Sequence, residues 1–479
     1  MNIYGRDQEP NFLQATSIYH PSTIERSLKH DGSGTEPGIK DNNGNWDLRP
    51  HKGRVMLVDV DVLSVWNSLL DRSDTPVEET SMVYSVNQSS FSVLEKLGKA
   101  RRISTLIPRI SHGWDENKAF QEGRFEKRWG VPESWDSVIL QGPHFYVGTP
   151  FYKYPNKTMK NHLDWTPVDL ESLKPDEIPI TKYKPVGDRQ SYDAQYTNWG
   201  DLDNPDPARS HYRVAWRSMA ANTGERTLIP ILIPKGTAHV DGVSSMGLAP
   251  TQNRELILCC AFLGSIVSDY LIRAVPKSTI RLPAISRLPY FDVEPLSSAV
   301  LIRALRLNCT TSVYGGLWEQ IVKNDLKSVQ PWDWAGGLEY SGRASLNSFS
   351  LSWNPEVPLK RASDRRQAML EIDVLTAMGL GITAEELCTV YRTQFPVLQA
   401  YDAHENVYDS NGRLVPSAIQ SRWRSLGRTQ CGNLFPASER QETCRLSRRL
   451  YRYDLPFLLL DREVEIRHAY RVFQDRLAQ

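Results

Sequence analysis

The hydrophobic pattern divides the chain into a short N-terminal segment, a β-rich middle and a helical C-terminal half. Residues 54–60, RVMLVDV, predict a strand, and short helical patterning follows it to Leu70. From about residue 100 to 250, β-branched and aromatic runs alternate with Pro, Gly and Asn clusters, as strands alternate with turns. Residues 227–234, TLIPILIP, predict a strand whose prolines suit an edge or a strand end. Residues 168–210 are rich in Pro and Asp and predict a long loop.

Helical periodicity replaces the β pattern after residue 250. Residues 253–273 predict one buried helix, whose longest uncharged run, 256–268, is too short to span a bilayer. Residues 361–378 predict the clearest helix of the chain, because Met369, Ile372, Leu375 and Met378 recur on one stripe. Three further features are predicted: a helix over 297–307, a capping box at Thr383–Glu386 that opens the next helix, and a last helix over 462–477.

These elements predict an α+β fold with three parts. Residues 1–85 form a short first segment, residues 86–290 a β-rich domain, and residues 291–479 a helical C-terminal region. The charge pattern places the first boundary near residues 85–100. Residues 41–80 are acidic, whereas residues 96–128 carry nine bases and four acids.

Composition excludes some classes of protein. The 479 residues include 57 Lys+Arg and 56 Asp+Glu, so nucleic-acid binding would need a local basic face rather than a polycationic chain. With 40% apolar and 24% charged residues, the composition is that of a folded protein. The six cysteines form no CxxC pair and have no histidine at zinc-finger spacing, which indicates reduced thiols. No signal peptide or membrane span is evident, so we expect a cytoplasmic protein.

A first candidate site for DNA lies between Asp136 and Asp164, where no acid occurs. Lysines can contact phosphates and aromatic rings can stack on bases, and both are interleaved in this segment. The candidate DNA contacts are His144, Lys153 and Lys157. The alternative is a β-rich core whose lysines point into solvent.

A second candidate site follows the sequence HYRVAWR at residues 211–217. Arg213 and Arg217 share a face in either a helix or a strand, and arginine makes bidentate contacts to guanine edges or phosphates. The candidate DNA contacts here are Arg213, Arg217, Asn222, Thr223 and Arg226. The alternative is that these arginines form surface ion pairs with Glu225.

Signals for catalysis are weak. A base-amino methyltransferase needs a Gly-rich cofactor loop and an Asn/Asp-Pro-Pro-aromatic motif, and the sequence contains no Pro-Pro dipeptide. Gly379-Leu380-Gly381 sits at a predicted helix end and indicates a C-cap rather than a cofactor loop. Asp325 and Lys327, with Glu319 nearby, leave open a metal-dependent nuclease. We therefore assign no catalytic, cofactor-binding or metal-binding residue.

Several motifs resemble the target-recognition half of large adenine-N6 DNA methyltransferases. These are the restriction–modification and phage-defence enzymes of the Eco57I type and their BREX and DISARM relatives. The motifs are QGPHF at 141–145, TPFYK at 149–153, YRVAWR at 212–217, ERTLIP at 225–230, the segments 255–289 and 364–398, and DREVEIRHAY at 461–470.

The resemblance implies a DNA-recognition chain that lacks the catalytic motif and is inactive alone. In such enzymes the cofactor loop and the catalytic motif lie upstream, and residues 1–85 then resemble the tail of the methyltransferase domain. S-adenosylmethionine is expected on the missing N-terminal half or on a catalytic partner subunit, and double-stranded DNA is the expected ligand. The alternative is an interaction scaffold of a defence complex, which the twelve Arg and seven acids of residues 421–479 also suit.

Overall fold

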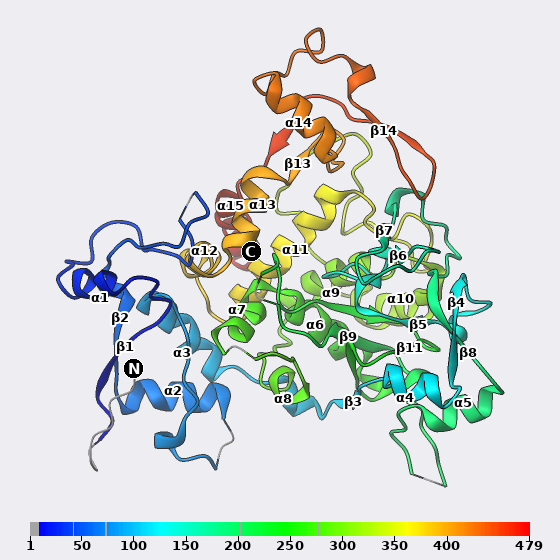
Figure 1. The fold of residues 1–479 in the computed structure, drawn as a ribbon, viewed down its shortest axis with the longest axis horizontal. Helices are drawn as coiled ribbons and strands as arrows, with labels where there is room; N and C mark the ends of the chain where they lie inside the picture. The colour runs from blue at the N-terminus through cyan, green and yellow to red at the C-terminus, as the bar shows by residue number, and fades with distance from the viewer. Residues whose placement is uncertain (1–8, 42, 72–73, 202, 222, 276) are drawn as a thin grey trace.

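The structure is a computed structural model of the chain, and it describes residues 9–41, 43–71, 74–201, 203–221, 223–275 and 277–479. Figure 1 shows an N-terminal unit on one side, a central body of helices packed on small sheets, and a C-terminal unit that projects at the top. The predicted α+β class and helical C-terminal region are confirmed, although the β structure is divided among many small sheets.

The N-terminal unit is a two-stranded sheet with three helices. Its elements are β1 (Phe12–Ala15), α1 (Pro21–Leu28), β2 (Val55–Val58), α2 (Val60–Leu70) and α3 (Phe91–Lys99). Asp59 caps α2 by accepting a hydrogen bond from the backbone N–H of Val62 at 3.0 Å. The strand predicted over 54–60 and the helical patterning to Leu70 are therefore confirmed as β2 and α2.

The middle of the chain holds most of the strands. They are β3 (Arg109–Ser111), β4 (Phe125–Gly130), β5 (Ile139–Leu140), β6 (Lys153–Pro155), β7 (Trp165–Pro167), β8 (Thr181–Pro185), β9 (Arg213–Arg217), β10 (Pro230–Ile233), β11 (Ala238–His239) and β12 (Val243–Gly247), with helices α4 (Glu116–Gln121) and α5 (Arg189–Gln195). The strand predicted within 227–234 is confirmed as β10. The prediction of one long loop over 168–210 is wrong, because β8 and α5 lie within it.

An antiparallel sheet of order β10-β9-β12-β3 forms the centre of this region. Strand β9 is covered on both faces. Val214 and Trp216 pack into the main helical core, whereas Ala215 packs into a second cluster with Val138 and Phe145. Side chains that alternate along β9 therefore all point into the protein, and the charged ends of the strand are interior positions.

Helices make up the rest of the central body. They are α6 (Asn253–Gly264), α7 (Ile266–Ala274), α8 (Leu282–Ile285), α9 (Leu296–Asn308), α10 (Gly315–Ile321), α11 (Ala362–Gly379), α12 (Ala384–Gln394), α13 (Pro396–His404) and α15 (Arg462–Leu477). The helices predicted over 297–307 and 462–477 are confirmed as α9 and α15. The predicted capping box is confirmed, since Thr383 Oγ1 accepts from the N–H of Glu386 and the Glu386 carboxylate accepts from the N–H of Thr383.

The single helix predicted over 253–273 is wrong, because the chain bends by 63° between α6 and α7. Ser265 caps the new helix through its hydroxyl, which accepts from the N–H of Ser268 at 3.2 Å. Asp373 of α11 accepts from the N–H of Ile266 at 2.8 Å. Among the described residues, no single helix is long and apolar enough to cross a membrane, and this bent pair passes that test on length and composition alone.

Helix α11 lies at the centre of the helical body. The helix predicted over 361–378 is confirmed as α11, and nearly all of its residues are buried, the charged ones included. Its Glu371 pairs with Arg303 of α9 at 2.6 Å, and both side chains are fully buried. Arg365 of α11 donates to the carbonyl oxygens of Leu359 and Leu307 at 2.7 and 3.0 Å. Internal partners for each charge allow a polar helix to occupy a core position.

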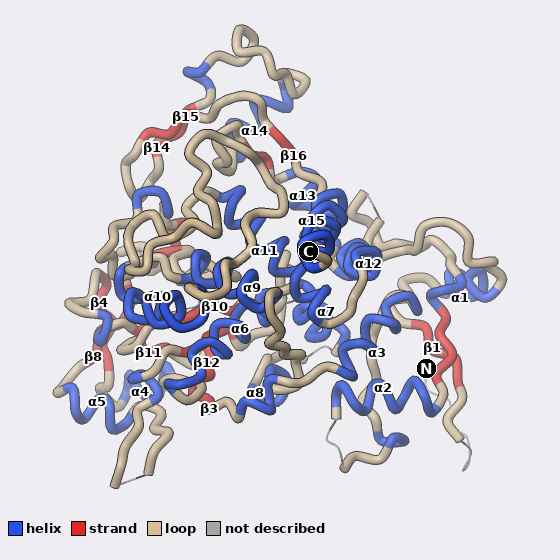
Figure 2. The backbone as a smooth tube through the Cα atoms, turned by 180° about the vertical axis from the view of Figure 1, so that it is seen from behind, coloured by secondary structure: helices blue, strands red, loops and turns tan. Residues whose placement is uncertain are grey.

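The C-terminal unit has its own small apolar core. Its elements are β13 (Val407–Tyr408), α14 (Ser417–Ser425), β14 (Gln441–Thr443), β15 (Leu450–Arg452) and β16 (Leu458–Leu459). Trp423, Phe435, Tyr451 and Phe457 pack together in this core. Figure 2, which views the molecule from behind, places β14, β15, β4 and β8 along one side and α1 to α3 along the other.

Candidate nucleic-acid interface

Arg213, a predicted DNA contact, lies inside the sheet. Its side chain is fully buried, and its guanidinium donates to the carbonyl oxygen of Thr237 and, at 3.4 Å, to the hydroxyls of Tyr196 and Ser245. Burial lowers the pKa of this group, and nearby Tyr196 opposes the shift. The prediction that Arg213 contacts DNA is wrong for this fold, because no atom of its side chain reaches the surface.

Arg217, at the other end of β9, fastens the turn that follows β5. Its Nε donates to the carbonyl oxygen of Gly142 at 2.9 Å, and its Nη2 donates to that of Phe145. The guanidinium also lies 5.7 Å from the ring centroid of Tyr146. The side chain is half-buried and its donors serve the protein's own backbone, so Arg217 shapes the site rather than reading a base.

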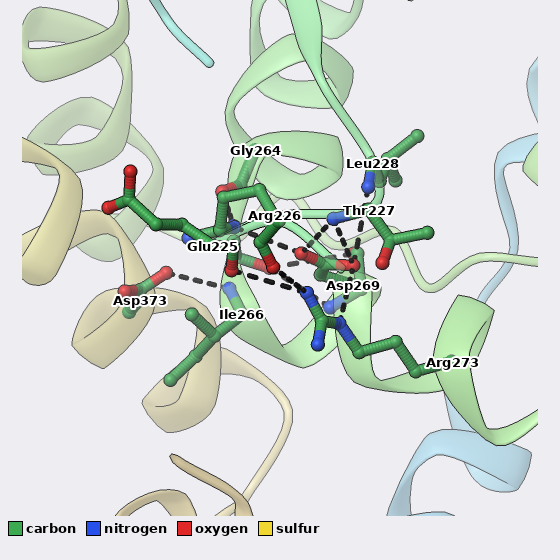
Figure 3. Close-up of polar contacts among 12 residues, drawn as sticks. Glu225, Arg226, Thr227, Leu228, Gly264, Ile266, Asp269, Arg273 and Asp373 are labelled. Carbon is green, nitrogen blue, oxygen red and sulfur yellow. Dashed lines mark hydrogen bonds and ion pairs between the residues drawn. The ribbon is translucent and has the colours of Figure 1, made fainter. Parts of the chain in front are cut away.

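Arg226 belongs to a segment that Asp269 holds against α7 (Figure 3). Asp269 accepts from the Nε of Arg226 at 3.0 Å and from the N–H groups of Thr227 and Leu228 at 3.0 and 3.3 Å. The Nε of Arg273 lies 3.4 Å from the same carboxylate. The prediction that Arg226 contacts DNA is therefore wrong, because its charge is buried and neutralised by Asp269.

The alternative of surface ion pairs with Glu225 is also wrong. Among the described residues, no ion pair joins Glu225 to Arg213, Arg217 or Arg226. Figure 3 shows the Glu225 carboxylate turned away from Asp269. Burial raises the pKa of Glu225, with a further increase from Asp402.

His144 is a structural residue, and its predicted contact with DNA is wrong. Its ring is buried, Nδ1 lies 2.8 Å from the backbone nitrogen of Gln141, and Nε2 lies 3.0 Å from the carbonyl oxygen of Ile180. Burial lowers its pKa to about 4, so the ring is neutral at physiological pH. An N–H donor on one side and a carbonyl acceptor on the other fit the tautomer that carries its hydrogen on Nε2.

Three of the predicted contacts remain. Lys157 and Thr223 are exposed, and Lys153 is half-buried with its Nζ 4.8 Å from the ring centroid of Tyr152. Burial, with a smaller effect of Arg217, lowers the pKa of Lys153. Asn222 lies outside the described residues. The structure thus divides the predicted DNA contacts into buried residues that support the fold and a smaller set that solvent can reach.

The main exposed segment among the predicted contacts is the loop between β6 and β7. Asp164 organises this loop, because its carboxylate accepts from Thr158 Oγ1 at 2.6 Å, Asn156 Nδ2 at 2.8 Å and the N–H of Lys160 at 2.9 Å. These hydrogen bonds, the one from Thr158 foremost, lower the pKa of Asp164 to about 2. The loop therefore has a defined shape, with the side chains of Lys157 and Lys160 in solvent.

The antiparallel strand pair β4–β8 lies beside this loop and adds further cations. Trp129, near the end of β4, donates from Nε1 to the carbonyl oxygen of Pro155 at 2.7 Å, which joins the β4–β8 pair to the β6–β7 hairpin. Lys127 and Arg128 are exposed on β4. We call the exposed side chains of Lys127, Arg128, Lys157 and Lys160 the hairpin surface. Such a set of flexible cations on a strand pair and the hairpin joined to it can contact successive phosphates of a nucleic-acid backbone.

Lys127, Arg128 and Lys160 were not among the site residues predicted from the sequence. The basic excess of residues 96–128 was a signal for the first two, and Lys160 lies in the acid-free segment. A count of charged residues cannot distinguish a buried arginine from an exposed one, because the hydrophobic pattern of a β-rich region does not show which face of each strand is covered.

The nuclease alternative finds no support in the surroundings of Asp325. This residue lies in a π-helical turn, and its carboxylate is 3.5 Å from Arg254, a partner that competes with any metal. Burial raises the pKa of Asp325. In the described part of the chain, no group of three His, Cys, Asp or Glu side chains is placed to hold a metal ion.

A groove of about 1150 Å³ lies between Lys40, Asp41, Asn43 and Gly44 on one side and the start of α15 on the other. Its polar walls are already paired. Asp402 binds Arg462 at 2.6 Å, and the Asp461 side chain caps α15 through the N–H groups of Glu463 and Val464. We assign no cofactor to this groove.

Comparison with known proteins finds no family model that matches the chain and no matching curated protein. The class of this protein therefore has to be inferred from its surfaces and from the motifs in its sequence.

Proposed function

We propose that this chain is the DNA-recognition part of a system that methylates adenine N6 with S-adenosylmethionine, in restriction–modification or phage defence. Double-stranded DNA is its ligand, and a partner subunit or an N-terminal half supplies the cofactor and the pocket for the flipped adenine. The observation that carries the proposal is the hairpin surface, an array of exposed cations on the β4–β8 strand pair and the β6–β7 loop that hydrogen bonds hold in place.

Because the arginines of β9 bind groups of the protein itself, we propose that another element, rather than β9, contacts the DNA. Arg217 and Arg226 build the scaffold, and the β6–β7 loop is the element that reaches outward. Phosphate contacts from Lys157 and Lys160 would set the register of the duplex, and Asn161 and His162, exposed in the same loop, carry donors and acceptors suited to base edges.

Replacing both Lys157 and Lys160 by glutamine is expected to weaken duplex binding equally for unrelated sequences. Each lost phosphate contact lowers the slope of log K against log[salt] by about 1, so the double variant should lose about 2. Fluorescence anisotropy from about 50 to 200 mM salt measures this slope. The matched control replaces Arg26 and Lys29, exposed bases of α1 on the far side of the molecule, and should bind like the wild type.

The proposal fails if the chain binds no duplex at about 50 mM salt, either alone or with its methyltransferase partner. A double variant that binds one sequence normally and another weakly would instead assign these lysines to base reading.

The N-terminal unit offers a surface for that catalytic partner. Leu13 and Leu57 face each other across β1 and β2 and are 62% and 47% exposed, and neighbouring Phe12 is 40% exposed. A two-stranded sheet is marginally stable by itself, and exposed apolar residues next to open strand edges are typical of protein interfaces. We propose that the catalytic subunit covers this face.

Replacing Leu13 and Leu57 by aspartate is expected to weaken capture of the catalytic subunit by at least 30-fold, since about 2 kcal/mol of apolar burial is lost. The test is a quantitative pull-down with a candidate methyltransferase catalytic subunit. Val464→Asp, an equally exposed apolar position on α15, is the control and should leave capture unchanged. Equal capture by the double variant and the control would refute this docking site.

A further inference from the structure

The β14–β15 hairpin carries a concentration of positive charge that the fold itself does not use. Residues 441–452 contain four arginines and one acid, and no acid occurs between Glu442 and Asp454. The hairpin pairs Gln441 with Arg452 and Thr443 with Leu450. We call residues 441–452 the arginine ribbon.

The turn of the ribbon presents its arginines to solvent. Arg445, Arg448 and Arg449 are exposed, and Arg448 adopts a left-handed conformation with φ of 59°. The turn is closed by hydrogen bonds from the N–H of Cys444 to the carbonyl of Arg449 at 2.9 Å and from the N–H of Arg448 to the carbonyl of Cys444 at 3.0 Å. The arginines therefore project from a shaped turn.

These side chains lack partners of opposite charge. Across the residues that the structure describes, no ion pair or side-chain hydrogen bond involves the guanidinium groups of Arg445, Arg448, Arg449 or Arg452. Arg449 lies 5.0 Å from the ring centroid of Tyr451, which orients it without neutralising it. Like charges so close in sequence reinforce one another's positive potential, so this cluster suits a polyanionic partner.

The ribbon is fixed in position next to the β6–β7 hairpin. Asp169, two residues after β7, accepts from Ser447 Oγ at 2.6 Å and from the Tyr451 hydroxyl at 2.8 Å. Burial would raise the pKa of Asp169, but the hydrogen bonds from Ser447 and Tyr451 bring it below its ordinary value. Figure 1 shows the orange-red hairpin that contains β14 descending toward β7. The ribbon and the hairpin surface thus lie on the same side of the molecule (Figure 2).

We propose that the arginine ribbon is a second contact with the same DNA duplex, made by Arg445, Arg448 and Arg449 with backbone phosphates. A two-stranded ribbon fits the major groove of B-DNA, which is about 12 Å wide. Guanidinium groups bind phosphates in a bidentate manner, and exposed groups need little desolvation to do so. The inference rests on the proposed function and extends it. The duplex runs across the hairpin surface and the ribbon, and the C-terminal unit acts as a DNA-binding module rather than only as a scaffold.

The test compares the full chain with a triple variant, Arg445→Gln, Arg448→Gln and Arg449→Gln, on a duplex of about 30 bp, roughly three helical turns. The slope of log K against log[salt] should fall by about 2–3, and Kd near 100 mM salt should rise about 30- to 500-fold. The loss should be the same for two unrelated duplex sequences, because phosphates carry no sequence information.

A control variant with the same loss of charge replaces Arg26, Lys29 and Arg471 by glutamine. All three are exposed and lie away from the ribbon, so binding should match that of the wild type. The midpoint of urea unfolding should be the same for both variants and the wild type, which shows that the variants are folded. A lower salt slope of the triple variant at an unchanged midpoint then supports the ribbon contact.

The outcomes separate this inference from the proposed function. A wild-type chain that binds DNA while the triple variant keeps the full slope overturns the ribbon contact and leaves the proposed function standing. Absence of duplex binding by the wild type, with or without the partner, overturns both. A triple variant that binds DNA normally but no longer captures the catalytic subunit assigns the ribbon to a protein partner and overturns the inference as well.

Discussion

Replacing Asp269 by alanine is expected to lower the free energy of unfolding by about 3–5 kcal/mol, the typical cost of breaking a buried ion pair from one side. The change leaves Arg226 and Arg273 buried without their carboxylate and removes the acceptor for the N–H groups of Thr227 and Leu228. Urea unfolding followed by tryptophan fluorescence and circular dichroism measures the loss.

Asp241→Ala is the control for this prediction. Asp241 is half-exposed and pairs with Arg281 at 3.3 Å, so its removal should cost no more than about 1 kcal/mol. A loss for Asp269→Ala as small as that for Asp241→Ala would show that the segment 225–228 does not depend on this carboxylate.

Replacing Arg213 by methionine is expected to destabilise the fold by about 2–4 kcal/mol, since the carbonyl of Thr237 and the hydroxyls of Tyr196 and Ser245 lose their donor in a buried site. At temperatures where the variant stays folded, its DNA affinity and sequence preference should equal those of the wild type, because Arg213 has no exposed surface.

Lys157→Gln should show the opposite pattern, with reduced DNA affinity and an unchanged free energy of unfolding. If Arg213 instead read a base, its replacement would cost about 1–3 kcal/mol of binding and relax the preference at one position of the site. That result at full stability would restore the sequence-based interpretation of Arg213 and contradict the buried placement.

Local signals predicted the elements whose causes are local. The helix at 462–477 and the capping box at Thr383 depend on residues within a few positions, and both are confirmed. The bend between α6 and α7 could not be predicted in this way, because Asp373, about a hundred residues downstream, supports the N-terminus of α7. Such a bend depends on a contact that exists only once the chain has folded.

The candidate site shows the same limit. A sequence can indicate that Arg213 and Arg217 share a face of a strand, but it cannot indicate that helices and loops cover both faces of β9. His144 carries no sign in the sequence that Ile180 lies against its ring. The exposed lysines of the β6–β7 loop were predictable, since turn-forming residues around Asp164 keep that loop at the surface.

The carboxylate of Glu171 connects three segments that are far apart in the sequence. Glu171 follows β7 and pairs with Arg361, just before α11, at 2.6 Å and with Arg413, in the C-terminal unit, at 2.9 Å. These two ion pairs link the C-terminal unit to the segment after β7 and to the start of α11. A force applied to the C-terminal unit by any bound partner would therefore act on these three segments together rather than on a single connection between them.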